Sequence, residues 1–338
     1  MCKIQKNISL LPYNTFGIDA KADYLLEYSS IDDLLEGLEN EIVKNNKVLA
    51  VGEGSNLLFV NDFKGVILHS KIKSINVFYE NDECAWIEAG SGVLWDDFVK
   101  FCVSEKYYGA ENLSLIPGQV GAAAVQNIGA YGVEIKDIVE DVATVELASG
   151  KIRVFTNEEC NYDYRDSVFK NSKKGKYIVT SVVFKLSKKE RYCFDYKHLK
   201  EETEKYGQVS LTNVRQAIVN IRTQKLPDTD VLGNAGSFFK NPYCTIEHFN
   251  YLQKEFPNIP FYAVNEEVVK LSAAWLIEQS GCKGKQIGNA AIYEKQPLVI
   301  VNQGNATAMD IVKLAENVQQ TVFEKFAVKL EREVNYIL

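Results

Sequence analysis

The sequence has few of the groups from which protein metal sites are built. It contains only three histidines, and its seven cysteines are dispersed, with no pair spaced as Cys-x-x-Cys. Zinc sites need clustered cysteine and histidine ligands, so no metal centre is expected. An odd number of dispersed cysteines also argues against a disulfide framework and is typical of reduced thiols in a cytoplasm.

The sequence also lacks an apolar run of about 20 residues, the length needed to cross a bilayer. Residues 1–11 contain two lysines but no apolar signal-peptide core. The 45 acidic residues outnumber the 38 basic ones and give a net charge of −7, which does not favour nucleic-acid binding. We therefore expect a cytoplasmic protein that acts on a small molecule, without a membrane or nucleic-acid partner.

The composition indicates a folded chain with more than one domain. Of the 338 residues, 46% are apolar and 25% are charged, as in ordinary soluble globular proteins. At roughly 150 residues per domain, the length suggests two or three domains. Helical and strand patterns are mixed rather than strictly alternating, which favours an α+β fold with boundaries near residues 65 and 215.

Individual segments have recognisable periodicities. A capping box at Ser30–Asp33 predicts a helix that runs to about Lys44, and residues 95–103 have helical spacing. Further helices are expected at 213–224, at 268–279 and from Thr307 onward. Strands are expected at 47–51, 57–60, 142–147, 152–155, 177–186, 298–301 and 328–337, and the polar stretch 187–206 is predicted to be a surface insertion.

The turn Gly52-Glu-Gly-Ser-Asn56 invites a dinucleotide-binding interpretation. The Rossmann fingerprint, however, needs three spaced glycines that lead directly into a helix, and this turn leads into the strand-like Leu57–Val60. Its glycines permit close approach, and its backbone N–H groups are suited to an anion. Taken alone, the segment is better interpreted as a plain hairpin turn.

The segment from Ile116 to Gly132 is more specific. It is rich in glycine and alanine, so few side chains fill the space around its backbone. A flat cofactor with phosphates would fill that space and accept hydrogen bonds from backbone N–H groups and from Gln126 and Asn127. The plainer alternative is close packing of a helix on a sheet, which small residues also permit.

Three segments carry polar residues that suit catalysis, each with a plainer alternative. Arg165 has the planar donor fork that binds carboxylates, or it pairs at the surface with a neighbouring aspartate. Ser237, in a glycine-rich segment without a nearby histidine, suits proton donation better than nucleophilic attack, and a structural turn serine is an equal alternative. Glu331 and Glu333 would share one face of a final strand, where an exposed charged edge is the default interpretation.

Taken together and in this order, these segments resemble the UDP-N-acetylenolpyruvoylglucosamine reductases (MurB), flavoenzymes of peptidoglycan synthesis. The insertion that contains Tyr196 and the segment 270–293 are similar to the longer, type I form. The residues that carry the resemblance are 14–16, 52–56, 116–118, 126–132, 164–167, 225–227, 233–242 and 330–334.

The resemblance implies a fold class and a domain plan. The fold would be α+β, with a two-subdomain FAD-binding part of the vanillyl-alcohol-oxidase/p-cresol-methylhydroxylase type and a smaller α+β substrate-binding domain. The corresponding ranges are 1–65 and 66–214 for the two FAD-binding subdomains, with an insertion at about 187–206, then 215–325 for the substrate-binding domain and 326–338 for a C-terminal strand that returns to the active site.

The resemblance also implies an activity. The enzyme would reduce UDP-N-acetylglucosamine enolpyruvate to UDP-N-acetylmuramate, with NADPH as co-substrate and non-covalent FAD as cofactor. Hydride would pass from flavin N5 to the enolpyruvyl methylene, and Ser237 would supply the proton. The enzyme would then serve cell-wall biogenesis, cell shape and cell division as a cytoplasmic monomer.

The resemblance assigns roles to individual residues. The catalytic positions would be Arg165, Ser237 and Glu333. The cofactor-binding positions would be Gly54, Ser55, Asn56, Pro117, Gly118, Gly121, Asn127, Gly129 and Tyr131. The substrate-binding positions would be Tyr164, Tyr196, Lys225, Asn241 and Gln296. Two departures from the family pattern are Glu53, which should point away from the phosphates, and Ala122, where relatives often have a hydroxyl residue.

Two other functions are compatible with these segments. One is a different flavin oxidoreductase of the same fold, such as a sugar or alcohol oxidase. Several of those link FAD covalently to histidine or cysteine, and the absence of histidine from both flavin segments counts against this alternative. The other is a non-enzymatic module that binds a UDP-sugar or a flavin, which the three catalytic matches disfavour.

Overall fold

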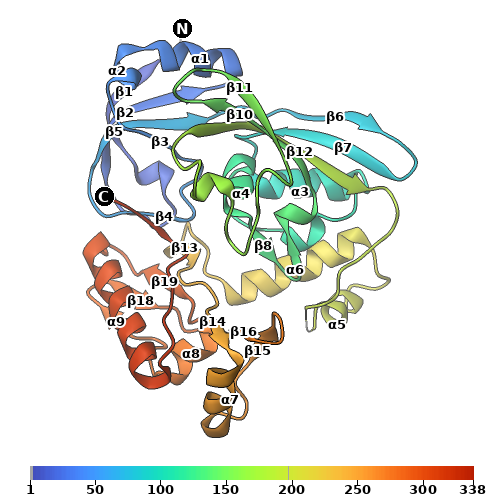
Figure 1. Cartoon of the computed structure of the whole chain (residues 1–338), viewed down its shortest axis with the longest axis vertical. Coiled ribbons are helices and arrows are strands. Elements are labelled where there is room, and N and C mark those ends of the chain that lie inside the picture. Colours follow the sequence, from blue (N-terminus) through green and yellow to red (C-terminus); the bar gives the residue numbers. More distant parts are fainter. Residues whose placement is uncertain (1–2, 197) are drawn as a thin grey trace. The chain divides into compact units, whose positions relative to one another are not determined.

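The computed structural model describes residues 3–196 and 198–338 and divides into two compact units (Figure 1). Unit 1 comprises residues 3–8, Lys21–Glu53 and Phe63–Gln224, and unit 2 comprises Ser9–Ala20, Gly54–Asp62 and Lys225–Leu338. These limits differ from the expected boundaries near 65 and 215. The segment Gly54–Asp62 belongs to unit 2 because strand β4 (Leu57–Phe59) pairs in parallel with the C-terminal strand β20 (Asn335–Ile337).

Unit 1 contains two main sheets. The four-stranded sheet has the order β1 (Ile4–Ser9), β2 (Lys21–Tyr28), β5 (Phe63–Ser70), β3 (Val48–Ala50), and both β2 and β3 run parallel to β5. The five-stranded sheet is antiparallel, with the order β11 (Ile152–Thr156), β10 (Val139–Glu146), β12 (Tyr177–Ser187), β7 (Cys84–Gly90), β6 (Ile75–Glu80). The strands predicted at 142–147, 152–155 and 177–186 are thereby confirmed.

Helix α3 (Trp95–Ser104) forms the core of unit 1 together with the five-stranded sheet (Figure 1). Its residues Trp95 and Phe98 are fully buried and lie against Phe184 of β12, with ring centroids 5.8 and 4.3 Å away. The helical spacing predicted for 95–103 therefore marked the buried face correctly. The remaining elements of unit 1 are α1 (Ile31–Glu39), α2 (Glu41–Lys44), η2 (Glu111–Leu113), α4 (Val120–Gln126), β8 (Gly129–Ala130), β9 (Val133–Glu134), η3 (Ile135–Asp137), η4 (Val168–Lys170), α5 (Leu199–Glu204) and α6 (Leu211–Lys225).

Unit 2 is built around helix α9 (Ala308–Phe326). Thr307 caps it as predicted, because its hydroxyl accepts from the Asp310 N–H and the Asp310 carboxylate accepts from the Thr307 N–H. Its buried face packs on a four-stranded sheet of the order β13 (Gly233–Ser237), β19 (Val299–Asn302), β18 (Ala290–Ile292), β17 (Gln286–Ile287). The other elements are η1 (Leu11–Tyr13), β14 (Tyr243–Thr245), α7 (Ile246–Glu255), β15 (Phe261–Ala263), β16 (Val268–Leu271) and α8 (Ala273–Gln279).

Three predicted elements are wrong in part. The helix expected from Ser30 to Lys44 breaks at Asn40, whose backbone is extended and whose side chain accepts from the Ile42 N–H to cap α2. In the segment 268–279, the first four residues form strand β16, and only the part after Ser272 is helical. At the C-terminus, only Asn335–Ile337 is a strand.

The correction at the C-terminus affects the two glutamates. Residues 330–334 make a single isolated bridge, between Phe239 and Arg332, rather than a continuous ladder. The argument that Glu331 and Glu333 share a face by strand alternation therefore does not apply.

Candidate active site

The turn at Gly54–Asn56 is fixed within unit 2 by backbone contacts. Gly54 has a φ of +65°, and a Cβ atom there would lie 2.0 Å from the carbonyl oxygen of Tyr13, so only glycine fits. The Nδ2 atom of Asn56 donates to the Glu333 carbonyl at 3.1 Å, and the Asn335 N–H donates to the Asn56 carbonyl at 3.1 Å. The turn is thus fastened to the segment that carries Glu333.

Ser237 and Glu333 lie on neighbouring segments of unit 2. Strand β13 ends at Ser237 after a register shift, and Gly236 has a φ of +69°. The Glu333 N–H donates to the carbonyl of Phe238, the residue after Ser237, at 2.9 Å. The structure therefore brings two of the three predicted catalytic residues onto adjacent backbone segments.

Arg165 lies in unit 1 and its side chain is only 18% exposed. Its guanidinium donates to the carbonyls of Asn127, at 3.4 Å, and of Gly129. It is also 3.8 Å from a carboxylate oxygen of Glu134 and lies over the Tyr164 ring, 5.2 Å from the centroid. The guanidinium is therefore held at the end of the glycine-rich loop.

Sequence reasoning did not single out Glu134. Besides its contact with Arg165, it accepts a hydrogen bond from Asn127 Nδ2 at 3.0 Å and pairs with Lys136 at 3.0 Å. Its side chain also caps the short helix η3. A capping signal, Glu134 followed by Asp137, was present in the sequence, but nothing in that pattern pointed to Arg165.

The structure gives packing reasons for two of the predicted cofactor-binding residues. Asn127 ends α4 in the left-handed conformation, and its fully buried amide donates to Glu134 and to the Asp163 carbonyl and accepts from the Lys136 N–H. At Gly121, a Cβ atom would come within 2.8 Å of the Ser91 side chain. Close packing of small residues, the plainer alternative for this loop, therefore accounts for Gly121, and hydrogen bonds within the protein account for the side chain of Asn127.

One group in the same loop suits a ligand. The Nε2 atom of Gln126 is buried, and among residues 3–196 and 198–338 it has no hydrogen-bond acceptor. A buried donor without an acceptor is costly, so a bound molecule that supplies acceptors would stabilise it. A flavin with its ring oxygens and phosphates is such a molecule, and the residues present fit it.

Other predicted positions in unit 1 have defined neighbours. Glu53 accepts a hydrogen bond from Gln119 Nε2 at 3.1 Å. The Tyr131 ring packs edge-on against Tyr196 with centroids 4.9 Å apart, and burial is the main reason that the pKa of Tyr131 is raised. Pro117 and Gly118, whose φ is +114°, precede α4.

The remaining substrate-binding candidates lie in unit 2. Lys225 is the last residue of α6, where unit 2 resumes. Asn241 Oδ1 accepts from the Ala273 N–H at 3.0 Å, at the start of α8. Gln296 lies in the turn before β19, where its carbonyl accepts from the Val299 N–H at 2.9 Å.

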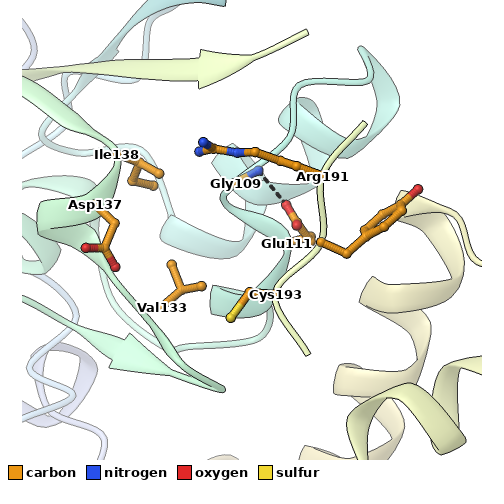
Figure 2. A pocket seen from close by; sticks show the side chains of 8 residues that line it. Gly109, Glu111, Val133, Asp137, Ile138, Arg191 and Cys193 are labelled. Atoms are coloured by element: carbon orange, nitrogen blue, oxygen red, sulfur yellow. Dashed lines mark hydrogen bonds between the residues drawn. The ribbon is translucent and has the colours of Figure 1, made fainter. Parts of the chain in front are cut away.

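A pocket of about 240 Å³ lies in unit 1 beside the short helix η2 (Figure 2). Glu111 is buried there, its carboxylate accepts from the Gly109 N–H at 2.7 Å, and burial raises its pKa. The residues that line the pocket are Gly109, Glu111, Val133, Asp137, Ile138, Arg191, Tyr192 and Cys193. None of them is a predicted site residue.

Metal clusters and membrane-spanning helices are both absent from the part of the chain that the structure describes. Within residues 3–196 and 198–338, no group of three or more histidine, cysteine or acidic side chains is placed to hold a metal ion. Among the helices that the structure describes, none has the length and apolar character of a membrane span.

Known proteins match both units. Residues 226–337 match the family model of the UDP-N-acetylenolpyruvoylglucosamine reductase C-terminal domain, and residues 22–156 match that of an FAD-binding domain. The UDP-N-acetylenolpyruvoylglucosamine reductase of Bacteroides fragilis is 48% identical over 334 residues, covering 99% of this chain and 100% of the relative. That of Flavobacterium johnsoniae is 43% identical over 338 residues, covering 99% and 100%.

A solved structure agrees with the sequence comparisons. The crystal structure of UDP-N-acetylenolpyruvylglucosamine reductase (MurB) from Thermus caldophilus aligns with a TM-score of 0.71 and 26% identity, covering 100% of both chains. Together with the FAD-binding match, this confirms the predicted α+β fold with an FAD-binding part of the vanillyl-alcohol-oxidase type.

Proposed function

Since the chain belongs to the family of UDP-N-acetylenolpyruvoylglucosamine reductases, we propose that it uses NADPH to convert this substrate to UDP-N-acetylmuramate. It is an FAD-dependent oxidoreductase of peptidoglycan synthesis. The single observation that carries the proposal is the match over 99% of the chain. The proposal extends to a cytoplasmic, monomeric enzyme with roles in cell shape and division.

The cofactor is assigned to two segments. When bound, FAD would supply the hydride chemistry, with NADPH as the source of the hydride and the enolpyruvyl methylene carbon as its acceptor from flavin N5. Gly54, Ser55 and Asn56 would hold it from one turn. Pro117, Gly118, Gly121, Asn127, Gly129 and Tyr131 would do so from the glycine-rich loop, where the unsatisfied Gln126 donor supports the assignment. No second nucleotide motif is present in the sequence, so NADPH and the substrate would use one site in turn.

Arg165 is assigned to the carboxylate of the enolpyruvyl group. Hydride addition moves negative charge toward that carboxylate, so a fixed guanidinium stabilises the transition state more than the ground state. The two backbone carbonyls and Glu134 that hold Arg165 support this role, because a preorganised cation needs no rearrangement during the reaction.

Ser237 is assigned as the donor of the proton to the carbon next to the carboxylate. A hydroxyl is a weak acid, but the charge-rich carbon formed by hydride addition is a strong base. Glu333 either is protonated in the working complex or orients Arg165 or a water molecule. The hydrogen bond between the Glu333 N–H and the Phe238 carbonyl supports a shared role for Ser237 and Glu333.

Substrate binding is assigned to side chains away from the reacting carbon. Lys225 and Asn241 would bind the diphosphate, and Tyr164, Tyr196 and Gln296 would contribute further contacts. Such remote binding energy orients the reacting end of the molecule. In the domain plan, ranges 1–65 and 66–214 bind FAD, 215–325 binds substrate, and 326–338 supplies Glu333.

The two half-reactions test the mechanism. We expect Ser237→Ala to leave bleaching of the flavin by NADPH nearly unchanged and to slow reoxidation by the enolpyruvyl substrate by about 100-fold or more, since general acids contribute at that scale. Ser280→Ala is the matched control, because the Ser280 hydroxyl donates to the Leu276 carbonyl of helix α8, which Ser280 ends, and Ser280 has no assigned role. If Ser237→Ala slowed both half-reactions equally, Ser237 would not be the proton donor.

A further inference from the structure

Asn112 joins two segments that are far apart in the sequence. It lies in η2 of unit 1, and its side chain is fully buried. Its Nδ2 atom donates to the Tyr131 carbonyl at 2.7 Å and to the Cys193 carbonyl at 2.9 Å, across 19 and 81 positions of the chain. One amide group therefore ties the glycine-rich loop to the polar insertion at 187–206.

Each end of this bridge lies in a segment that carries a residue with an assigned role. Tyr131 belongs to the proposed cofactor loop and has a left-handed backbone, with a φ of +50°. Tyr196 follows Cys193 by three positions, and its ring packs on the Tyr131 ring. The position of the Cys193 backbone thus affects where the Tyr196 ring lies relative to Tyr131.

The short helix that carries Asn112 is itself held firmly. Glu111 is buried and its carboxylate accepts from the Gly109 N–H, as Figure 2 shows. The Ser114 hydroxyl donates to the Glu111 carbonyl. These two bonds shape the segment 109–114, and the Trp95 indole N–H of α3 donates to the Leu113 carbonyl at 2.8 Å, which fastens η2 to helix α3. Asn112 therefore lies on a segment that is held independently of the two loops it joins.

The amide is not explained by packing alone. Its Oδ1 atom is buried, and no donor within the described residues reaches it. A buried carbonyl without a donor carries an uncompensated desolvation cost, which an apolar side chain of similar size would avoid. The two hydrogen bonds from Nδ2 are the contacts that only an amide at this position makes.

We propose that Asn112 is a positioning residue for substrate binding, which acts by holding the Tyr196 segment against the Tyr131 loop. The inference rests on the proposed function, because it takes Tyr196 as a substrate contact. Loss of the bridge removes the amide hydrogen bonds that hold the Cys193 backbone to the cofactor loop and leaves weaker contacts there, the packing of the Tyr196 ring on Tyr131 and a 3.9 Å contact of the Cys193 thiol with the Tyr131 carbonyl. The substrate must then order that segment itself, and this ordering lowers its affinity.

The test compares Asn112→Ala with a matched control in the FAD-loaded enzyme. Asn157 also lies in unit 1, and its Nδ2 donates to two backbone carbonyls, those of Lys136 and Val139, each at 2.7 Å, but neither belongs to the proposed site. We expect Asn112→Ala to raise the KM for the enolpyruvyl substrate about tenfold, equivalent to about 1.4 kcal/mol, with a change in kcat below about twofold. Asn157→Ala should leave both constants unchanged. Asn112→Ser, whose hydroxyl donates a single hydrogen bond, should give an intermediate KM and serves if the alanine variant folds poorly.

A double-mutant cycle tests whether Asn112 acts through Tyr196. Tyr196→Ala alone should raise KM, and the double variant Asn112→Ala/Tyr196→Ala should match it within about twofold. If the two substitutions raise KM independently, so that the increase in the double variant is the product of the two single increases, the inference is overturned. It is also overturned if the KM of Asn112→Ala is no higher than that of Asn157→Ala. If the unmodified protein reduces the substrate while these tests fail, only the inference is wrong. If the unmodified protein has no turnover, the proposed function fails and the inference fails with it.

Discussion

The partly buried ion pair between Asp96 and Arg215 allows a quantitative stability prediction. The two side chains are 19% and 14% exposed and form two parallel hydrogen bonds of 2.8 Å between the first turn of α3 and helix α6. Asp96 also accepts from the Leu115 N–H at 2.6 Å and lies 3.5 Å from the Lys100 ammonium. Replacing Arg215 with alanine would leave the Asp96 carboxylate without its main partner.

The size of the expected loss in unfolding free energy depends on the partners that Asp96 retains in the variant. Breaking a buried ion pair by removing one partner costs about 3–5 kcal/mol. Asp96 retains the Leu115 N–H and the nearby Lys100, and it is partly exposed to water, so the cost is reduced. We expect Arg215→Ala to lower the free energy of unfolding of unit 1 by about 2 kcal/mol at neutral pH.

The loss should depend on pH. Burial raises the pKa of Asp96, but the hydrogen bonds from Arg215 and from the Leu115 N–H, with the charges of Arg215 and Lys100, outweigh it and hold the pKa below its ordinary value. A carboxyl with a lowered pKa in the folded state stabilises the protein above its unfolded pKa of about 3.9 and loses that contribution as pH falls through the folded value. In Arg215→Ala the hydrogen bonds and the charge of Arg215 are lost, so the difference in unfolding free energy between wild type and variant should shrink as pH falls below about 4, where the wild-type protein loses this contribution.

Urea denaturation at saturating FAD, at pH 7 and at about pH 3.5, measures both effects. Lys44→Ala is the control within unit 1, because Lys44 pairs with Glu39 at 2.6 Å while the two side chains are 44% and 79% exposed, and such pairs contribute little. The reasoning is refuted if Arg215→Ala is no more destabilising than Lys44→Ala. It is also refuted if the difference between wild type and Arg215→Ala is as large at about pH 3.5 as at pH 7.

Two further predictions concern a glycine and the buried thiols. Gly54→Ala should lower the melting temperature more than Gly175→Ala. Both glycines have a φ near +70°, but the new Cβ at Gly54 would lie 2.0 Å from a backbone oxygen, whereas nothing lies within 4 Å at Gly175. Equal losses of melting temperature would contradict the steric argument. Burial raises the pKa of Cys160 to about 11 and raises the pKa of Cys102 as well. At pH 8, iodoacetamide should therefore label both thiols far more slowly than the half-buried Cys84, as measured by peptide mass spectrometry. Labelling of Cys160 as fast as that of Cys84 would contradict this prediction.

The long periodic elements of this fold could be predicted from the sequence. Helix α9 has a capping box followed by apolar residues at three- and four-residue steps, and the structure buries those residues on one face. The break at Asn40 could not be predicted in the same way, because the apolar pattern continues through Ile42 and Val43 and conceals the second cap. Strand β16 was missed since its four residues, Val268-Val-Lys-Leu271, are too few for their periodicity to separate strand from helix.

The family was predictable because side-chain identity carries its signal, whereas the contacts around the candidate site were not predictable, because their partner is the backbone. The order of the motifs, with Arg165, Ser237 and Glu333, sufficed for the family. The contacts that hold those motifs are mostly side chains bonded to distant carbonyls, as Arg165 is to Gly129, 36 positions away, and Asn112 is to Cys193, 81 positions away. Every residue has a carbonyl, so such a partner leaves no trace in the sequence of the residue that supplies it. Only the donor has a distinctive side chain, and a single asparagine such as Asn112, between Glu111 and Leu113, does not reveal which loops it joins.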